Sequence, residues 1–259
     1  DLLVVDGIVN GVGAATRWWV IAYGVLCYTA FLASFGYAVL FVLGIGVSRT
    51  VDHGIAASAP QAIAVNLALL GAFAAQHSIM ARPGFKRRWT RIVPPPVERS
   101  TFVLAASAAL GLLCWQWRTV DGTVWHIDQP IARTLVWTVA AAGWLTVLAT
   151  TFMINHFELF GLRQVFAFWR GRRCAETGFR TPLLYRVVRH PMMLGFLLAF
   201  WAAPTMTAGH LLFASVTTVY ILAAIRLEER DLSTSLGEQY CQYRRQVPMV
   251  VPAGRCPRH

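Results

Sequence analysis

Long runs of apolar residues constrain the fold of this sequence more than any other feature. A run of about 20 apolar residues can cross a bilayer as a helix, because a helix pairs its backbone polar groups internally. Four such runs precede a polar stretch and a last apolar region, which the segment APTMTAG (203–209) divides into two arms of a helical hairpin. We therefore predict an all-α, polytopic membrane protein with about six transmembrane helices and short cytoplasmic helices. The predicted spans cover residues 18–46, 60–80, 101–117, 131–154, 192–203 and 209–227.

The distribution of positive charge sets the predicted orientation. The chain is 56% hydrophobic and 14% charged, yet its net charge is +11. With the N-terminus in the cytoplasm, twenty Lys and Arg residues lie inside and only Arg49, Arg118 and Arg133 lie outside, as expected because cytoplasmic loops are rich in these residues. Basic loops thus explain the charge without a nucleic-acid partner. We expect an integral protein of a bacterial inner membrane, in contact with the lipid bilayer, with both termini cytoplasmic.

The spans and their loops are predicted to form one membrane domain. A dinucleotide-binding turn needs a strand before it and a soluble helix after it, but a predicted membrane span begins at Trp18, soon after the Gly11-x-Gly13 pair. The five cysteines show no metal-ligand spacing, so we expect no metal site. Within the domain of residues 1–259 we distinguish an N-terminal tail (1–17), four spans (18–154), a cytoplasmic segment (155–191), the hairpin (192–227) and a cytoplasmic tail (228–259).

Charged side chains collect where the predicted hairpin meets the cytoplasm. Arg189 and His190 precede its first arm, and Glu228 and Glu229 follow its second arm. The arms of a hairpin run antiparallel, so the two pairs return to one place. Carboxylates beside an apolar span are costly unless they have partners. These groups therefore suit a zwitterionic ligand, whose carboxylate would meet Arg and whose ribose would meet Glu.

Two aromatic residues and two further cations complete this region. Residues 225–248 are predicted to form two short helices with a break at Gly237. Tyr240 and Tyr243 lie in the second and are expected to close over the ligand. The alternative interpretation is that the two Glu residues pair with Arg226 and Arg230 on a solvated face, where ion pairs contribute little.

The same region resembles a known family. The motifs RHPMMLG (189–195), LEERDL (227–232) and GEQYCQYRRQVP (237–248) are similar to the C-terminal signature of the isoprenylcysteine carboxyl methyltransferases and their membrane relatives. The resemblance implies that S-adenosylmethionine binds here and leaves as S-adenosylhomocysteine. The chain departs from the pattern at Met193, where the family usually has Tyr. The residues expected to hold the cofactor are Tyr185, Arg189, His190, Pro191, Leu194, Gly195, Arg226, Glu228, Glu229, Tyr240 and Tyr243.

Further motifs resemble one branch of this family, whose members methylate methanethiol to dimethyl sulfide. QHSIMARPGFK (76–86) and TFMINHFELFGLRQVF (151–166) are similar to that branch, and the likeness extends over roughly residues 19–252. It implies methylation of a small thiol at the cytoplasmic membrane face. The alternatives are a methyltransferase for a larger lipid-like substrate, such as prenylcysteine or a phospholipid, a sterol-type reductase that uses NADPH, and a membrane protein without catalytic activity.

A base would help the methylation of a thiol, because the thiolate is the nucleophile and a small thiol is mostly protonated at neutral pH. His77 ends the second predicted span and His156 follows the fourth, so both lie at the predicted cytoplasmic face. Asn155 and Glu158 lie beside His156 and are expected to orient it, which favours His156 over His77. The candidate catalytic residues are therefore His156, His77, Asn155 and Glu158.

Overall fold

The structure, a computed structural model, describes residues 13–172, 174 and 178–251. Most of the predicted N-terminal tail, including Gly11, lies outside the described residues, as does the end of the predicted cytoplasmic tail. Three of the twenty predicted inside charges, Arg173, Arg255 and Arg258, also lie outside them.

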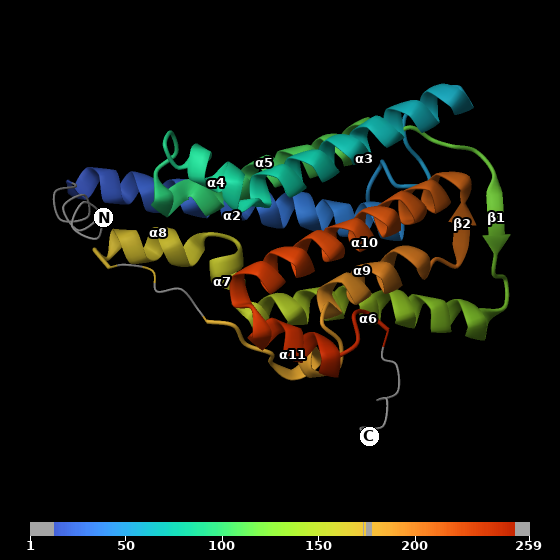
Figure 1. Ribbon diagram of the computed structural model, residues 1–259. Coiled ribbons are helices and arrows are strands. Elements are labelled where there is room, and N and C mark those ends of the chain that lie inside the picture. Colours follow the sequence, from blue (N-terminus) through green and yellow to red (C-terminus); the bar gives the residue numbers. More distant parts are fainter. Residues whose placement is uncertain (1–12, 173, 175–177, 252–259) are drawn as a thin grey trace, which may run out of the picture.

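Five helices in the described residues are long and apolar enough to cross a membrane. They run along one another in an elongated bundle (Figure 1). The prediction of an all-α membrane protein is confirmed. These helices are α2 (Ala14–Leu43), α3 (Ala59–Ala81), α5 (Pro95–Gln116), α6 (Pro130–Ile154) and α10 (Ala208–Leu236).

The first arm of the predicted hairpin is a short helix, α9 (Pro191–Trp201). Its 11 residues rise by roughly 16 Å, about half the thickness of the hydrocarbon core. The bundle therefore has five full-length helices and one of half length. The second arm, α10, continues to Leu236, nine residues beyond the predicted exit at residue 227.

Proline and glycine mark the helix boundaries. Pro stands in the first two positions of α3, α5, α6 and α9, where its fixed φ suits the helix and its missing N–H leaves no unpaired donor. Gly237 separates α10 from α11 (Glu238–Gln246) with φ 57° and ψ −130°, a conformation that a side chain disfavours. The predicted break at Gly237 is thus confirmed.

A two-stranded antiparallel ribbon closes one end of the bundle. β1 (Thr123–His126) pairs with β2 (Thr205–Thr207), with Thr123 opposite Thr207. β2 lies inside the segment 203–209 that was predicted to be only a turn, so the sequence analysis missed the strand. We call this end of the bundle the ribbon end (Figure 1).

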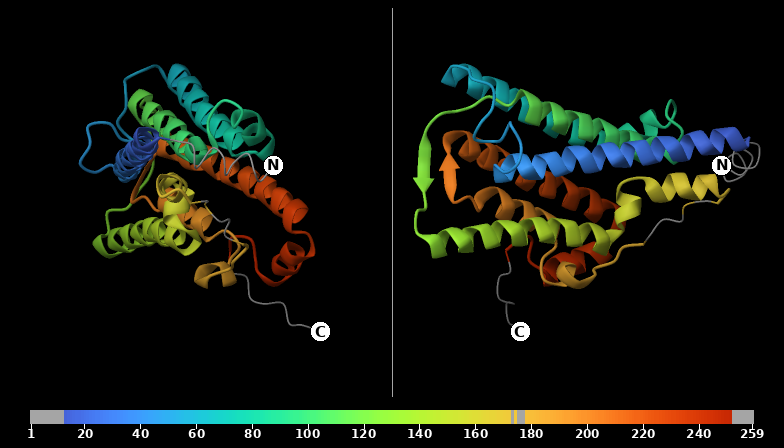
Figure 2. Two further views of the ribbon diagram at one scale, coloured as in Figure 1. Left: turned by 90° about the vertical axis from the view of Figure 1, so that its left-hand side faces the viewer. Right: turned by 180° about the vertical axis from the view of Figure 1, so that it is seen from behind.

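The opposite end is built from short elements, and we call it the basic end. It contains the start of α2 and the ends of α3, α6 and α10 (Figures 1 and 2). Arg and Lys side chains are frequent in its short elements. These are α4 (Pro83–Trp89), α7 (His156–Leu159), α8 (Leu162–Trp169), the 3₁₀ turn η1 (Leu183–Arg186) and α11.

Glycine allows α6 and α9 to pack closely, and α6 and α9 make the most extensive contact between elements. A Cβ at Gly143 would lie 2.7 Å from the backbone N of Ala199 and the carbonyl O of Gly195. A Cβ at Gly195 would lie 2.8 Å from the carbonyl O of Gly143. Small residues of this kind let helix backbones approach in membranes. The apolar side chains on the outer surface, among them Trp19 and Val219, fit contact with lipid.

Candidate active site

The centre of the candidate site is an ion pair between the start of α9 and the end of α10. Arg189 Nε donates to Glu229 Oε1 over 2.7 Å, and His190 Nε2 lies 3.1 Å from the same oxygen. The side chains of Arg189 and Glu229 are only 10% and 12% exposed. The structure therefore brings together the two residue pairs that the sequence placed at the ends of a hairpin.

Arg189 also forms hydrogen bonds with the end of α11 and the segment that follows it. Its Nη1 donates to the carbonyl oxygens of Arg244 and Val247, each over 2.7 Å. The backbone N–H groups of Arg189 and His190 donate to the carbonyls of Pro248 and Met249. Arg189 thus directs two of its nitrogens to protein acceptors, and its expected contact with a cofactor carboxylate stays a prediction.

Glu228 presents the more open carboxylate of the pair. Its side chain is 53% exposed, and Oε2 lies 3.7 Å from His190 Nδ1. In the described residues, Glu228 pairs with His190, and Glu229 pairs with Arg189 and His190. The alternative interpretation expected pairs with Arg226 and Arg230, and the described residues show none. Glu228 is the carboxylate with room for a ligand.

Three tyrosines lie beside these carboxylates. Tyr243 donates its hydroxyl to the carbonyl of Tyr185 over 2.5 Å, and burial raises the pKa of Tyr243 to about 12. Burial, together with the charge of Glu229, also raises the pKa of Tyr240. Burial and the charge of Glu228 raise the pKa of Tyr185. All three phenols are therefore protonated at neutral pH.

Tyr240 differs from Tyr243 in its hydrogen bonding. It is 1% exposed, yet its buried hydroxyl has no hydrogen-bond partner among the described residues. Buried polar groups are almost always paired, so an unpaired one requires an explanation. Its ring contacts Phe179 and Tyr243, with centroids 6.0 Å and 5.9 Å away. A ligand acceptor beside this hydroxyl would satisfy it.

The other predicted cofactor residues lie along α9 and α10. Pro191 is the buried first residue of α9, and Leu194 packs against the apolar core. Gly195 backs onto α6, so a neighbouring helix occupies the space that its missing side chain leaves. Arg226 is exposed on α10. Cofactor contact at these four positions stays a prediction.

His156, the favoured base, is held by Tyr28 of α2 and Thr151 of α6. The Tyr28 hydroxyl lies 2.7 Å from His156 Nε2, and Thr151 Oγ1 lies 2.8 Å from Nδ1. The ring stacks on Phe152 at 4.3 Å between centroids. His156 is only 6% exposed, and burial lowers its pKa. The imidazole is therefore neutral at pH 7.

Asn155 and Glu158 bond to one another, and their expected role in orienting His156 stays a prediction. Asn155 Nδ2 donates to Glu158 Oε2 over 2.9 Å, and Arg163 pairs with the same carboxylate. Asn155 also caps the start of α7, where its side chain accepts from the N–H of Glu158. These residues stabilise the bend between α6 and α7, because their hydrogen-bonding groups turn to one another and to Arg163.

His77, the other candidate base, lies near the basic end of α3. Its ring lies between Phe73 and Phe102, with centroids 5.5 Å and 5.2 Å away. Its Nδ1 is buried without a hydrogen-bond partner. Arg99, over the Phe102 ring, donates to the carbonyl of Leu159. The His77 and His156 regions are thus connected through α5.

The packing of α6 on α9 relates His156 to the Arg189–Glu229 pair. The two helices run antiparallel, and Val147 lies against Gly195. One helical turn further, Thr151 lies level with Pro191, the residue after His190. Packed helices lie about 8–10 Å apart, so Thr151 and its partner His156 are at the depth of the ion pair on a neighbouring helix. The candidate catalytic and cofactor residues therefore share one end of the bundle.

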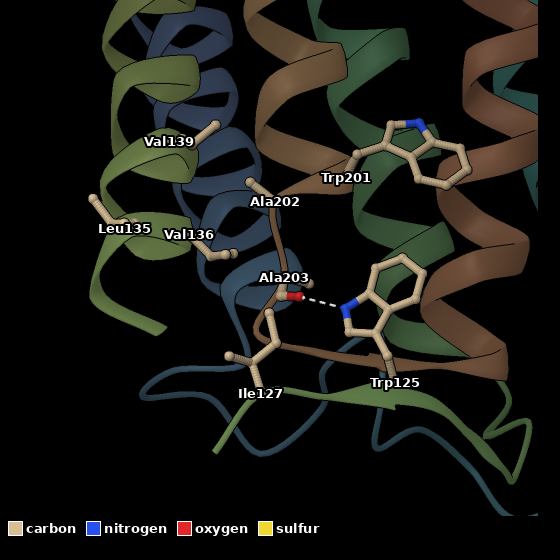
Figure 3. Close-up of a pocket in the computed structure, with 8 residues that line it drawn as sticks. All are labelled: Trp125, Ile127, Leu135, Val136, Val139, Trp201, Ala202 and Ala203. Atoms are coloured by element: carbon tan, nitrogen blue, oxygen red, sulfur yellow. Dashed lines mark hydrogen bonds between the residues drawn. The ribbon is translucent and has the colours of Figure 1, made fainter. Parts of the chain in front are cut away.

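The apolar pocket at the ribbon end is far from these residues. It has a volume of about 340 Å³ and is lined by apolar side chains of β1, α6 and the end of α9 (Figure 3). Trp125 Nε1 donates to the carbonyl of Ala203 at its rim. No titratable side chain lines it, so it lacks groups for acid–base chemistry.

The sequence analysis missed three residues that the structure adds to the site. Tyr28 and Thr151 hold His156, and Arg82 pairs with Asp231 of α10 over 2.6 Å. Tyr28 lies in the middle of the first apolar run, where its polar hydroxyl was a usable signal. Its partner could not be predicted, because the contact joins residues 128 positions apart.

The five long apolar helices and the polar cluster at one end define an integral membrane protein. Residues 65–247 match the family model described as NnrU protein. The chain belongs to this family. It is 60% identical to methanethiol S-methyltransferase from Mycobacterium tuberculosis, over 91% of this chain and 97% of that protein. It is 52% identical to methanethiol S-methyltransferase 1 from Bradyrhizobium diazoefficiens, over 89% and 81%.

A more distant relative is Nurim from Xenopus laevis, which is 26% identical over 89% of each chain. No solved structure matches the chain. The likeness to the methanethiol-methylating branch, expected from the sequence motifs, is confirmed by the closer relatives.

Proposed function

We propose that this protein methylates methanethiol with S-adenosylmethionine, producing dimethyl sulfide and S-adenosylhomocysteine. The observation that carries the proposal is the 60% identity to a methanethiol S-methyltransferase over 91% of the chain. Fold alone does not define function, but this likeness covers 91% of this chain and 97% of that protein.

The described residues fit a sulfonium cofactor with an amino acid group and a ribose. The buried Tyr240 hydroxyl without a partner is a donor for a ligand oxygen. The half-exposed Glu228 carboxylate suits an ammonium group, ribose hydroxyls or the positive sulfonium. Glu229, Arg189 and His190 hold the walls of this site through their mutual bonds. We assign the cofactor to the space bordered by Glu228, Tyr240 and Tyr243.

When bound, the cofactor would supply an electrophilic methyl group. The protein's task is then to hold the thiol sulfur in line with that methyl group and to accept the thiol proton. Orientation of two reactants can supply most of the acceleration. A positioned base typically contributes about 10²–10⁴-fold. The neutral His156 and the unpaired nitrogen of His77 are the candidate acceptors.

The reaction is assigned to the cytoplasmic membrane face of a bacterial inner membrane. The basic end holds most of the chain's Arg and Lys residues, and such residues concentrate on the cytoplasmic side. A single-carbon thiol buries little surface, at about 0.8 kcal/mol per CH₂. Affinity for it should be weak, and selectivity should come from excluding larger thiols.

The test is cofactor binding and product formation by purified protein in lipid nanodiscs. We expect S-adenosylhomocysteine to raise the thermal midpoint, because a ligand that binds only the folded state stabilises it, and NADPH to leave it unchanged. Labelled S-adenosylmethionine should give labelled dimethyl sulfide from methanethiol and no product from glutathione.

Three results would contradict the proposal. Protection by NADPH instead would favour a reductase. Comparable turnover of a prenylcysteine would favour a larger lipid-like substrate. If neither S-adenosylhomocysteine nor NADPH raises the thermal midpoint, the result would favour a membrane protein without catalytic activity.

A further inference from the structure

We propose that Tyr28 takes the thiol proton and passes it to His156, which Thr151 holds in one tautomer. The proposal rests on the function proposed above. It follows from a hydrogen-bonded chain of three side chains on α2, α6 and α7: Tyr28 hydroxyl, His156 imidazole and Thr151 hydroxyl.

The hydrogen bonds of Thr151 determine where His156 carries its proton. Thr151 Oγ1 donates its single hydrogen to the carbonyl of Leu148 over 2.7 Å. It therefore accepts from His156 at 2.8 Å, so the proton of the neutral ring is on Nδ1. Nε2 then has a free electron pair and accepts from the Tyr28 hydroxyl at 2.7 Å. His156 is thus prepared to receive a proton only at Nε2, through Tyr28.

The surroundings of His156 leave little direct access for a substrate. The ring is stacked on Phe152 and contacts Phe157 and Phe160, with centroids 4.3, 5.4 and 4.8 Å away. His156 is 6% exposed, whereas Tyr28 is only partly buried. Tyr28 is therefore the more accessible residue of the pair, and we place the thiol on the Tyr28 side of the imidazole.

The transfer balances in protons and electrons. The thiol proton moves to the Tyr28 oxygen while the Tyr28 hydroxyl proton moves to His156 Nε2. The S–H electron pair stays on the thiol sulfur, which forms the new C–S bond. The electron pair of the broken bond leaves on the donor's sulfur, and the imidazolium later releases its proton to solvent. The face of Phe152 stabilises the protonated ring meanwhile.

His77 is less suited to the same task despite its unpaired nitrogen. It lies inside α3, and its ring lies between Phe73 and Phe102. No hydrogen-bonded group hands it a proton in the described residues.

The experiment compares Tyr28→Phe with Tyr23→Phe in nanodiscs. Tyr23, on the same helix, bonds to Thr101, and the ring of His156 bonds instead to Tyr28 and Thr151, so Tyr23 is the matched control. We expect Tyr28→Phe to lower kcat about 10- to 100-fold at pH 7, a loss in the range of a base. Part of it should return at pH 9, where thiolate forms in solution. Affinity for S-adenosylhomocysteine should be unchanged in both variants.

The reaction rate of the wild-type protein should fall at low pH. Only neutral His156 accepts a proton, and burial lowers its pKa from the ordinary 6.5. The rate should therefore have reached its plateau by pH 7 and should fall as the pH drops through a value below 6.5. Thr151→Val should lower kcat at pH 7, and Thr151→Ser, which keeps the hydroxyl, should restore it.

A second measurement is independent of activity. Nitrogen NMR of histidine-labelled protein, with His156 assigned through His156→Gln, should show a protonated Nδ1 and a bare Nε2. Tyr28→Phe should shift the Nε2 signal, and Tyr23→Phe should not.

Several outcomes would overturn the relay. They are a wild-type rate at pH 7 in Tyr28→Phe, a proton on Nε2 in the NMR spectrum, or equal losses in Tyr28→Phe and Tyr23→Phe. Loss of the pH 7 rate in His77→Ala alone would assign the base to His77. Absence of dimethyl sulfide from the wild type would instead reject the proposed function, which the NMR result does not measure.

Discussion

At the scale of single residues, the two neighbouring glutamates are expected to have different roles. Glu229 accepts from Arg189 and His190 and is 12% exposed, whereas Glu228 is 53% exposed. Glu229→Ala leaves buried donors without an acceptor, which costs about 1–3 kcal/mol of unfolding free energy. Glu228→Ala removes a half-exposed carboxylate, so it should leave the stability nearly unchanged.

The two glutamates are also expected to affect the affinity for the cofactor product. Both substitutions should weaken S-adenosylhomocysteine binding by one to two powers of ten, or about 1.4 to 2.8 kcal/mol. Titration calorimetry gives the affinity, and the thermal midpoint without ligand gives the stability. Unchanged affinity in both variants would reject the cofactor's placement, and equal stability losses would reject the division between the two roles.

At the scale of helices, the contact between α6 and α9 positions the site, and it depends on glycine. A Cβ at Gly143 would lie 2.7 Å from backbone atoms of α9, which cannot move aside as a side chain would. Gly143→Ala should therefore destabilise the protein by about 1–3 kcal/mol, as overpacking does. The thermal midpoint in detergent and the rate should both fall, because Thr151 and Pro191 shift relative to one another.

Gly36→Ala is the matched control for this substitution. Gly36 lies in the middle of α2, and nothing lies within 4 Å of the position of its missing Cβ. Alanine there should be neutral or stabilise by up to about 1 kcal/mol, because it favours the helix. Equal midpoints for the two variants would show that the close contact is unimportant.

At the scale of the whole molecule, the arrangement predicts which loops face the cytoplasm. Asp128 lies at the ribbon end, and Arg87 lies on α4 at the basic end, both exposed. In a background with the native cysteines replaced, an impermeant maleimide should label Asp128→Cys in intact spheroplasts. It should label Arg87→Cys only after lysis. The reverse pattern would invert the orientation and move the site to the other side.

Features that depend on residues close in sequence could be predicted from the amino-acid sequence alone. Apolar runs identified all five long helices, because a span needs about 20 apolar residues whatever its neighbours are. Gly237 ended α10 as predicted, since its backbone conformation disfavours a side chain. The hairpin topology also brought Arg189 and Glu229 together, because two antiparallel arms return to the same end.

The pairing of side chains that are distant in sequence could be seen only in the folded protein. In the fold, Asn155 hydrogen-bonds to Glu158, and His156 hydrogen-bonds to Tyr28 of another helix. Arg189 also hydrogen-bonds to carbonyls at the end of α11 and after it, and β1 pairs with β2. Such pairings depend on helix rotation and register, and the nearly uniform apolar surface of a membrane helix carries little information about either.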